Sequence, residues 1–164
     1  MGEISEMSKI LKPDIALITN IGSSHIGNLG SKDNILKAKL EILDGNQNGI
    51  LFINEDDNYL NSIDYKNTYR FKTLEGKVLD NGIEINIDNK NIYLNLLGRH
   101  NILNISAVYN ISSYLGINII DSLKDYENIR IKEYYINGTR ILDDSYNANY
   151  ESMINGIEYI DKLN

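Results

Sequence analysis

The first part of the chain alternates between apolar runs and polar segments. Residues 14–19 form a nearly continuous apolar run, which is typical of a strand covered on both faces of a sheet. The polar, glycine-rich residues 20–30 predict a loop, and Ser31 can cap a helix over residues 32–43. A second buried strand is predicted over residues 49–53. This order of strand, helix and strand predicts an α/β domain with a mainly parallel sheet flanked by helices.

The middle of the chain has a different pattern, in which short segments of residues 71–96 alternate between apolar and polar positions. Asn81-Gly82 and residues 88–90 supply turn residues between these segments. The pattern predicts an antiparallel β meander added to the parallel sheet. Apolar residues at helical spacing then predict a helix over residues 100–115.

The last part of the chain predicts two strands and a helix. The strands are expected over residues 129–136 and 139–142, joined at Asn137-Gly138, and the helix over residues 151–163. Four apolar residues of this helix need a partner surface that the rest of the sequence hardly provides: Met153, Ile154, Ile157 and Ile160. The chain is therefore expected to be a piece of a longer protein.

Composition excludes several classes of function. The 164 residues include 16 basic and 23 acidic side chains, and the formal net charge of −7 argues against general nucleic-acid binding. Cysteine is absent, which excludes disulfides, thiolate metal sites and cysteine nucleophiles. No apolar run approaches the roughly 20 residues that a membrane span needs. A soluble cytoplasmic protein is expected.

Lys39 is the most informative single residue. At about 100° per residue, it falls within the apolar stripe of its predicted helix. Burial would favour the neutral amine, which is nucleophilic and could capture carbon dioxide as a carbamate, a carboxylate-like metal ligand. The alternative is an ordinary lysine whose stem lies along the apolar surface while its ammonium group reaches water.

His25 lies in the loop after the first predicted strand, at the sheet edge where open α/β proteins bind ligands. Its ring could bind a divalent metal ion, and a carbamate at Lys39 could supply a second ligand. The alternative is a histidine that only forms hydrogen bonds within its loop.

Asn101 and Asn104 lie one turn apart at the start of the predicted helix over residues 100–115. Two carboxamides in this position could read the donor and acceptor edge of a purine. Alternatively, one caps the helix and the other is a partly buried polar residue.

Two further polar features follow. Residues 143–149, Asp-Asp-Ser-Tyr-Asn-Ala-Asn, come directly after a predicted strand and could hold a ribose hydroxyl or a metal, although a helix-capping turn is the alternative. Arg130 precedes a predicted strand and could contact phosphate, or form a surface ion pair. The sequence contains neither G-x-x-x-x-G-K-[ST] nor G-x-G-x-x-G, so no common phosphate-binding loop is present.

Together these segments resemble the Mur ligases, the ATP-dependent amide-forming enzymes of peptidoglycan synthesis. Residues 13–26, which include Ser24-His25-Ile26, resemble the strand and metal-histidine loop of the family's central domain. Residues 34–42 are similar to its helix with the carbamylated lysine. Residues 98–104 match its G-x-H-N-x-x-N adenine-contacting segment, and residues 143–149 resemble its hinge into a C-terminal domain.

The resemblance implies a role for each matching residue. His25 and carbamylated Lys39 would be catalytic and would hold Mg²⁺. ATP would be bound by His100, Asn101, Asn104, Arg130 and Asp144, and the hinge would consist of Ser145, Tyr146, Asn147 and Asn149. The family's phosphate loop and its magnesium-binding glutamate would lie before Met1.

The chemistry that the resemblance implies is the addition of D-Ala-D-Ala to UDP-N-acetylmuramoyl-tripeptide through an acyl phosphate, with ATP and Mg²⁺. Residues 1–145 would form a partial ATP-binding central domain, and residues 146–164 the hinge and first helix of the next domain. The chain alone is expected to be inactive. Alternatives are another Mur-like ligase such as a folylpolyglutamate synthase, a non-catalytic nucleotide-binding module, and a purely structural domain.

Overall fold

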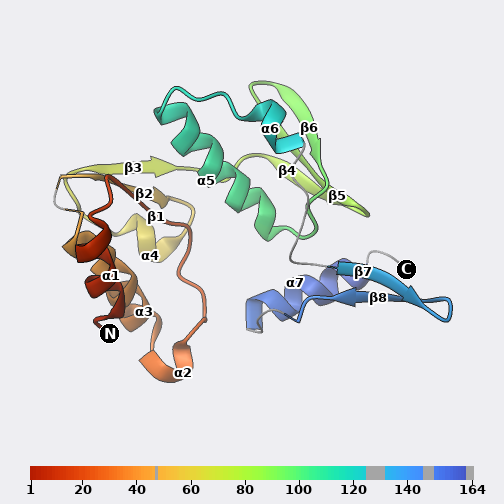
Figure 1. Cartoon of the computed structure of the whole chain (residues 1–164), viewed down its shortest axis with the longest axis horizontal. Coiled ribbons are helices and arrows are strands. Elements are labelled where there is room, and N and C mark those ends of the chain that lie inside the picture. Colours follow the sequence, from red (N-terminus) through yellow and green to blue (C-terminus); the bar gives the residue numbers. More distant parts are fainter. Residues whose placement is uncertain (47, 125–131, 146–149, 162–164) are drawn as a thin grey trace. The chain divides into compact units, whose positions relative to one another are not determined.

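A computed structural model describes residues 1–46, 48–124, 132–145 and 150–161 (Figure 1). The described residues form two compact units. The first contains residues 1–73 together with residues 106–111, and the second contains the other described residues.

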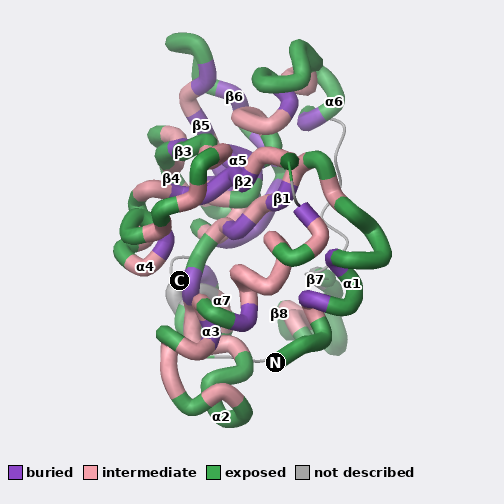
Figure 2. The backbone as a smooth tube through the Cα atoms, turned by 90° about the vertical axis from the view of Figure 1, so that its left-hand side faces the viewer, coloured by how far each residue is buried: buried purple, intermediate pink, exposed green. Residues whose placement is uncertain are grey.

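The first unit is built on a parallel three-stranded sheet. Its strands β1 (Ile15–Ile18), β2 (Ile50–Asn54) and β3 (Thr68–Phe71) lie in that order, and both neighbouring pairs are parallel. The first two strands confirm the prediction from the apolar runs. Leu51, Phe52 and Ile53 of β2 are fully buried, which explains why this run has no polar alternation (Figure 2).

Four helices accompany this sheet: α1 (Glu3–Leu11), α2 (Ile26–Leu29), α3 (Lys32–Leu40) and α4 (Asn58–Asn61). Ser31 caps α3 as predicted, because its Oγ accepts the Asn34 N–H at 3.2 Å. The core of the unit joins the sheet to the helices and consists of Ala16, Ile18, Ile21, Ile35, Leu51, Ile53 and Leu60.

The predicted helix over residues 32–43 ends earlier than expected. After Leu40 the chain tightens into the 3-10 turn η1 (Glu41–Asp44), and the Glu41 N–H donates to both Ala38 O and Lys39 O. The Glu41 carboxylate accepts the Gly2 N–H of the segment that leads into α1. The predicted helix thus changes to a 3-10 turn at the point where the chain packs against α1.

Gly45 follows η1 and packs closely against α1. A methyl group at this position would overlap the Ser8 carbonyl, and the Gly45 N–H already donates to Ser8 Oγ at 3.0 Å. We expect Gly45→Ala to lower the free energy of unfolding by about 2–3 kcal/mol, because the backbone must shift to admit the methyl group. Chemical denaturation measures the change. Gly27→Ala is the matched control, since nothing lies within 4 Å of its methyl position, and equal stability of the two variants would contradict the prediction.

The second unit contains the predicted antiparallel meander. Its strands are β4 (Gly76–Leu79), β5 (Gly82–Ile87) and β6 (Lys90–Leu94). Asp88 and Asn89 both have positive φ values, 51° and 61°, as a two-residue turn between twisted strands requires. The α/β class, a parallel sheet with helices and an added antiparallel meander, is confirmed.

The remaining elements are α5 (His100–Tyr114), α6 (Ile120–Lys124), the antiparallel pair β7 (Lys132–Ile136) and β8 (Thr139–Asp143), and α7 (Tyr150–Asp161). Apart from α6, which was not predicted, they match the predicted helices and strands. Residues 129–131 and 162–163 of those predictions lie outside the described ranges. The buried Tyr159 of α7 donates its hydroxyl to Asp80 O at 2.7 Å. Within the described ranges, no helix is both long and apolar enough to cross a membrane.

Candidate functional site

The loop that follows β1 is anchored to the core by the side chain of Ile21. Ile21 is 3% exposed and packs in the core with Ala16 and Ile18 of β1. The preceding residue, Asn20, is exposed. The start of the loop is therefore fixed to the carboxyl end of β1, at the sheet edge where ligands bind in α/β folds.

Lys39 of α3 reaches this loop. Its stem is half-buried, and its Nζ donates a hydrogen bond of 2.6 Å to Asn20 O. Desolvation lowers the pKa of Lys39 below its ordinary value of 10.5, and the negative charge of Asp57 acts in the opposite direction. The neutral, nucleophilic amine is thus more available at a given pH than in a fully solvated lysine.

Asp57 also belongs to this site, although the sequence did not predict it. It lies three residues after the end of β2 and caps α4, where its Oδ1 accepts the N–H groups of Tyr59 at 2.9 Å and Leu60 at 3.1 Å. Its Oδ2 accepts the Ile21 N–H at 2.8 Å. The sequence feature that could have indicated Asp57 is the acidic segment Glu55-Asp56-Asp57. It follows a predicted strand at the same sheet edge as His25.

His25 is exposed and has a left-handed backbone, with φ of 65°. It precedes α2, one helical turn within the stretch that was predicted to be a loop throughout. Its carbonyl accepts the Asn28 and Leu29 N–H groups, while its side chain makes no capping hydrogen bond. Since α2 packs against α3, His25 and Lys39 lie on neighbouring helices.

The donor set for a metal at this edge is incomplete in the described part of the chain. No group of three or more histidine, aspartate or glutamate side chains is placed there to hold a metal ion. His25 offers an exposed imidazole, and Lys39 offers an amine that can become a carboxylate-like ligand. Two ligands of these types suit a divalent ion whose other positions are taken by phosphate or water oxygens.

The second unit contains the predicted adenine-binding residues. Asn101 and Asn104 are brought together as expected, because Asn104 Nδ2 donates to Asn101 Oδ1 at 3.2 Å. Asn101 is half-buried and also donates from Nδ2 to Leu97 O at 2.8 Å, whereas Asn104 is exposed. His100 begins the same helix, after Gly98, whose φ is 92°. In this pair, the inner carboxamide, that of Asn101, is held by hydrogen bonds, and the outer carboxamide, that of Asn104, is exposed.

The polar residues after β8 are described only in part. Asp143 Oδ1 accepts the Ser145 N–H at 3.0 Å, and the Ser145 hydroxyl and N–H lower the pKa of Asp143. This is a local turn in which an aspartate side chain accepts the N–H group two residues on. Asp144 is half-buried and Ser145 is exposed. Arg130, Tyr146, Asn147 and Asn149 lie outside the described residues.

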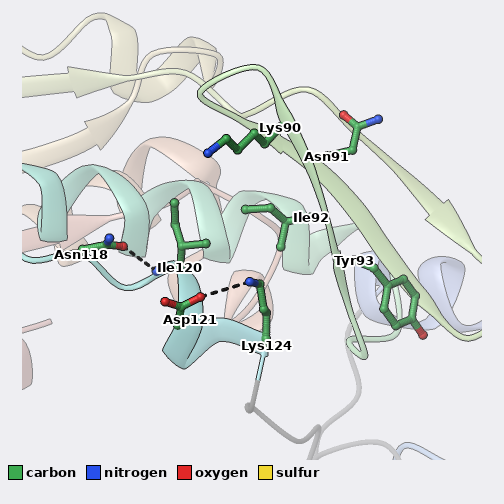
Figure 3. A pocket seen from close by; sticks show the side chains of 8 residues that line it. All are labelled: Lys90, Asn91, Ile92, Tyr93, Asn118, Ile120, Asp121 and Lys124. Carbon is green, nitrogen blue, oxygen red and sulfur yellow. Dashed lines mark hydrogen bonds and ion pairs between the residues drawn. The ribbon is translucent and has the colours of Figure 1, made fainter.

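A separate cleft of about 570 Å³ lies between β6 and α6 (Figure 3). Ile92 and Ile120 contribute apolar surface, and the Lys124 ammonium forms an ion pair of 3.1 Å with Asp121. None of the candidate site residues lines this cleft.

Comparison with known proteins identifies relatives over nearly the whole chain. The Mur ligase middle-domain family matches residues 1–111. A UDP-N-acetylmuramoyl-tripeptide–D-alanyl-D-alanine ligase of Bacillus subtilis is 29% identical, over 99% of this chain and 39% of its own length. The ligase of the same name from Rickettsia prowazekii is 32% identical, over 99% of this chain and 42% of its own length. The chain thus spans about two fifths of these relatives.

Solved structures also resemble this chain over nearly its whole length. MurF from Acinetobacter baumannii superposes with a TM-score of 0.89 at 26% identity, covering 100% of this chain and 41% of its own. MurF ligase from Thermotoga maritima, solved in complex with ADP, has a TM-score of 0.82 at 24% identity, covering 96% of this chain and 41% of its own. At 24% identity, the similarity to the Thermotoga maritima structure shows the fold alone.

Proposed function

Because this chain belongs to the Mur ligase family, whose middle-domain model matches residues 1–111, we propose that it is part of the ATP-binding domain of a UDP-N-acetylmuramoyl-tripeptide–D-alanyl-D-alanine ligase. The full-length protein would add this dipeptide to UDP-N-acetylmuramoyl-tripeptide. The observation that carries the proposal is that two relatives named as ligases of this tripeptide and D-alanyl-D-alanine match 99% of the chain. A cytoplasmic location follows from the proposed use of ATP and a UDP-linked substrate.

The proposed reaction has two chemical steps. A carboxylate oxygen of the tripeptide attacks the γ-phosphorus of ATP, which releases ADP and gives an acyl phosphate. The amine of D-Ala-D-Ala then attacks the acyl carbon, loses a proton and displaces inorganic phosphate. The amide bond formed retains one oxygen of the original carboxylate, and the phosphate carries the other.

Lys39 and His25 are proposed to serve the phosphate end of this reaction. The neutral Lys39 amine would add to carbon dioxide and lose a proton, giving a carbamate that retains one N–H. That N–H can still donate to Asn20 O, the acceptor that Lys39 has here. The carbamate and the His25 ring would hold Mg²⁺. When bound, this ion offsets the negative charge of the phosphate groups.

ATP is proposed to lie with its adenine against the start of α5. The exposed carboxamide of Asn104 offers both donor and acceptor groups, and Asn101 holds it by a side-chain hydrogen bond. His100, Arg130 and Asp144 would contact other parts of the nucleotide. Residues 1–145 are proposed to belong to the ATP-binding domain, and residues 146–164 to the hinge and start of the next domain.

Replacing Asn104 by alanine tests the proposal that its carboxamide binds the adenine of ATP. We expect Asn104→Ala to raise KM for ATP about tenfold with little change in kcat, because it removes hydrogen bonds made to bound nucleotide throughout the reaction. Steady-state kinetics of the full-length gene product measure both constants. Asn110→Ala is the control on the same helix, where Asn110 donates to Ser106 O one turn earlier. An unchanged KM in Asn104→Ala would contradict the assignment.

Phosphate release tests the proposed function directly. The full-length gene product is incubated with ATP and UDP-N-acetylmuramoyl-tripeptide, with either D-Ala-D-Ala or single amino acids. Release that requires the dipeptide is expected. Release with a single amino acid would indicate another Mur-like ligase, and no release with any acceptor would favour a non-catalytic module.

A further inference from the structure

One peptide group in the loop after β1 is held from both sides. It joins Asn20 to Ile21. Its carbonyl accepts the hydrogen bond from Lys39 Nζ at 2.6 Å, and its N–H donates to Asp57 Oδ2 at 2.8 Å. The peptide bond is trans, as are all those described, so its carbonyl and N–H point in opposite directions. Lys39 and Asp57 therefore flank the same peptide group.

Asp57 is itself firmly placed. Its Oδ1 accepts two N–H groups at the start of α4, from Tyr59 and Leu60, and Leu60 is fully buried in the core. The Ile21 side chain is buried in the same core cluster. The carboxylate thus joins two parts of the unit that lie 36 residues apart in the sequence.

The charge of Asp57 reaches Lys39 through this peptide group. A carboxylate that accepts the peptide N–H polarises the group and makes its carbonyl oxygen a stronger acceptor. The hydrogen bond from Lys39 to that oxygen is strengthened, and its direction is fixed by the orientation of the peptide plane. Helix capping alone would require only Oδ1, so the bond from Oδ2 to Ile21 needs a separate explanation.

We propose that Asp57 is a positioning residue for Lys39. Through its hydrogen bond to Ile21 it fixes the Asn20–Ile21 peptide group, and this peptide group holds the Lys39 amine at the carboxyl edge of the sheet. The claim that positioning Lys39 matters for catalysis rests on the proposed function. The claim that Asp57 positions Lys39 does not.

The substitution Asp57→Asn separates positioning from capping. Asparagine caps helices about as well as aspartate, so its single oxygen can retain the two hydrogen bonds at α4. Its amide group would then face the Ile21 N–H, donor against donor, and that hydrogen bond would be lost. Asp56→Asn is the matched control, because it removes one charge at the adjacent residue, whose carboxylate accepts the Thr73 N–H instead.

Two NMR measurements on the 164-residue chain test the proposal. In Asp57→Asn we expect the Ile21 amide to exchange with solvent about tenfold faster than in the Asp56→Asn control, while the Tyr59 and Leu60 amides keep their protection. With ¹³C-labelled lysine, the two ε-methylene protons of Lys39 should have separate shifts in the wild type and in Asp56→Asn. They should merge in Asp57→Asn, because the released side chain rotates freely.

Unchanged Ile21 exchange, or unchanged Lys39 signals, in Asp57→Asn would overturn the proposal. If this variant fails to fold, Asp57→Ser takes its place, since serine also caps helices and is too short to reach Ile21 as well. In the full-length gene product, kcat for ligation should fall about tenfold with KM for ATP unchanged. Absence of ligation in the wild type would refute the proposed function, whereas the NMR results would still decide the role of Asp57.

Discussion

Replacing Lys39 by arginine is expected to reduce kcat of the full-length gene product at least about a hundredfold, the scale of losing one electrostatic contributor to a transition state. Arginine keeps the positive charge and can still donate to Asn20 O. Its guanidinium stays protonated, however, so it cannot add to carbon dioxide. Steady-state phosphate release with ATP, UDP-N-acetylmuramoyl-tripeptide and D-Ala-D-Ala measures the effect.

The control for this variant is Lys37→Arg, on the same helix at an exposed position, which should retain wild-type kcat. A second readout is independent of turnover. Wild-type protein incubated with ¹³C-bicarbonate should give a carbamate signal in the NMR spectrum that is absent in Lys39→Arg. Activity of Lys39→Arg within a few fold of the wild type would show that no carbamate at this residue is needed.

The largest effect on stability is expected at Phe52. This fully buried residue of β2 is paired in register with Tyr69 of β3, and the two rings stack with centroids 4.6 Å apart. Phe52→Ala should lower the free energy of unfolding by about 3–5 kcal/mol, because it leaves a cavity in the sheet core and removes the ring contact. Urea denaturation of the 164-residue chain measures the loss.

Phe52→Leu provides the comparison, since leucine fills most of the same volume and should cost only about 1–1.5 kcal/mol. A loss in Phe52→Ala no greater than that in Phe52→Leu would mean that the face of β2 that carries Phe52 is not closely packed.

Elements with strong apolar periodicity could be predicted from the sequence, and those fixed by distant contacts could not. The buried strands β1 and β2, the meander and α5 all followed from local patterns. In contrast, β3 exposes Tyr69 and Arg70 and lies at the edge of the sheet, so its sequence lacks a regular alternation. No pattern within residues 41–44 indicated that this segment would pack against α1 as a 3-10 turn.

The same distinction applies to the candidate site. The helical position of Lys39 among apolar residues predicted its partial burial, and the one-turn spacing of Asn101 and Asn104 predicted their contact. Asp57 could not be connected to the site in this way. Its hydrogen bond to Ile21 joins residues 36 positions apart, and only the packing of the parallel strands brings them together.

An isotope-transfer experiment tests the proposed acyl-phosphate reaction most directly. UDP-N-acetylmuramoyl-tripeptide labelled with ¹⁸O in its terminal carboxylate is incubated with ATP, D-Ala-D-Ala and the full-length gene product, and the inorganic phosphate is analysed by mass spectrometry. An acyl phosphate predicts that one labelled oxygen appears in the phosphate for each dipeptide joined. Unlabelled phosphate would contradict the proposed reaction, because the terminal phosphate of ATP would then have been transferred to water instead of the carboxylate.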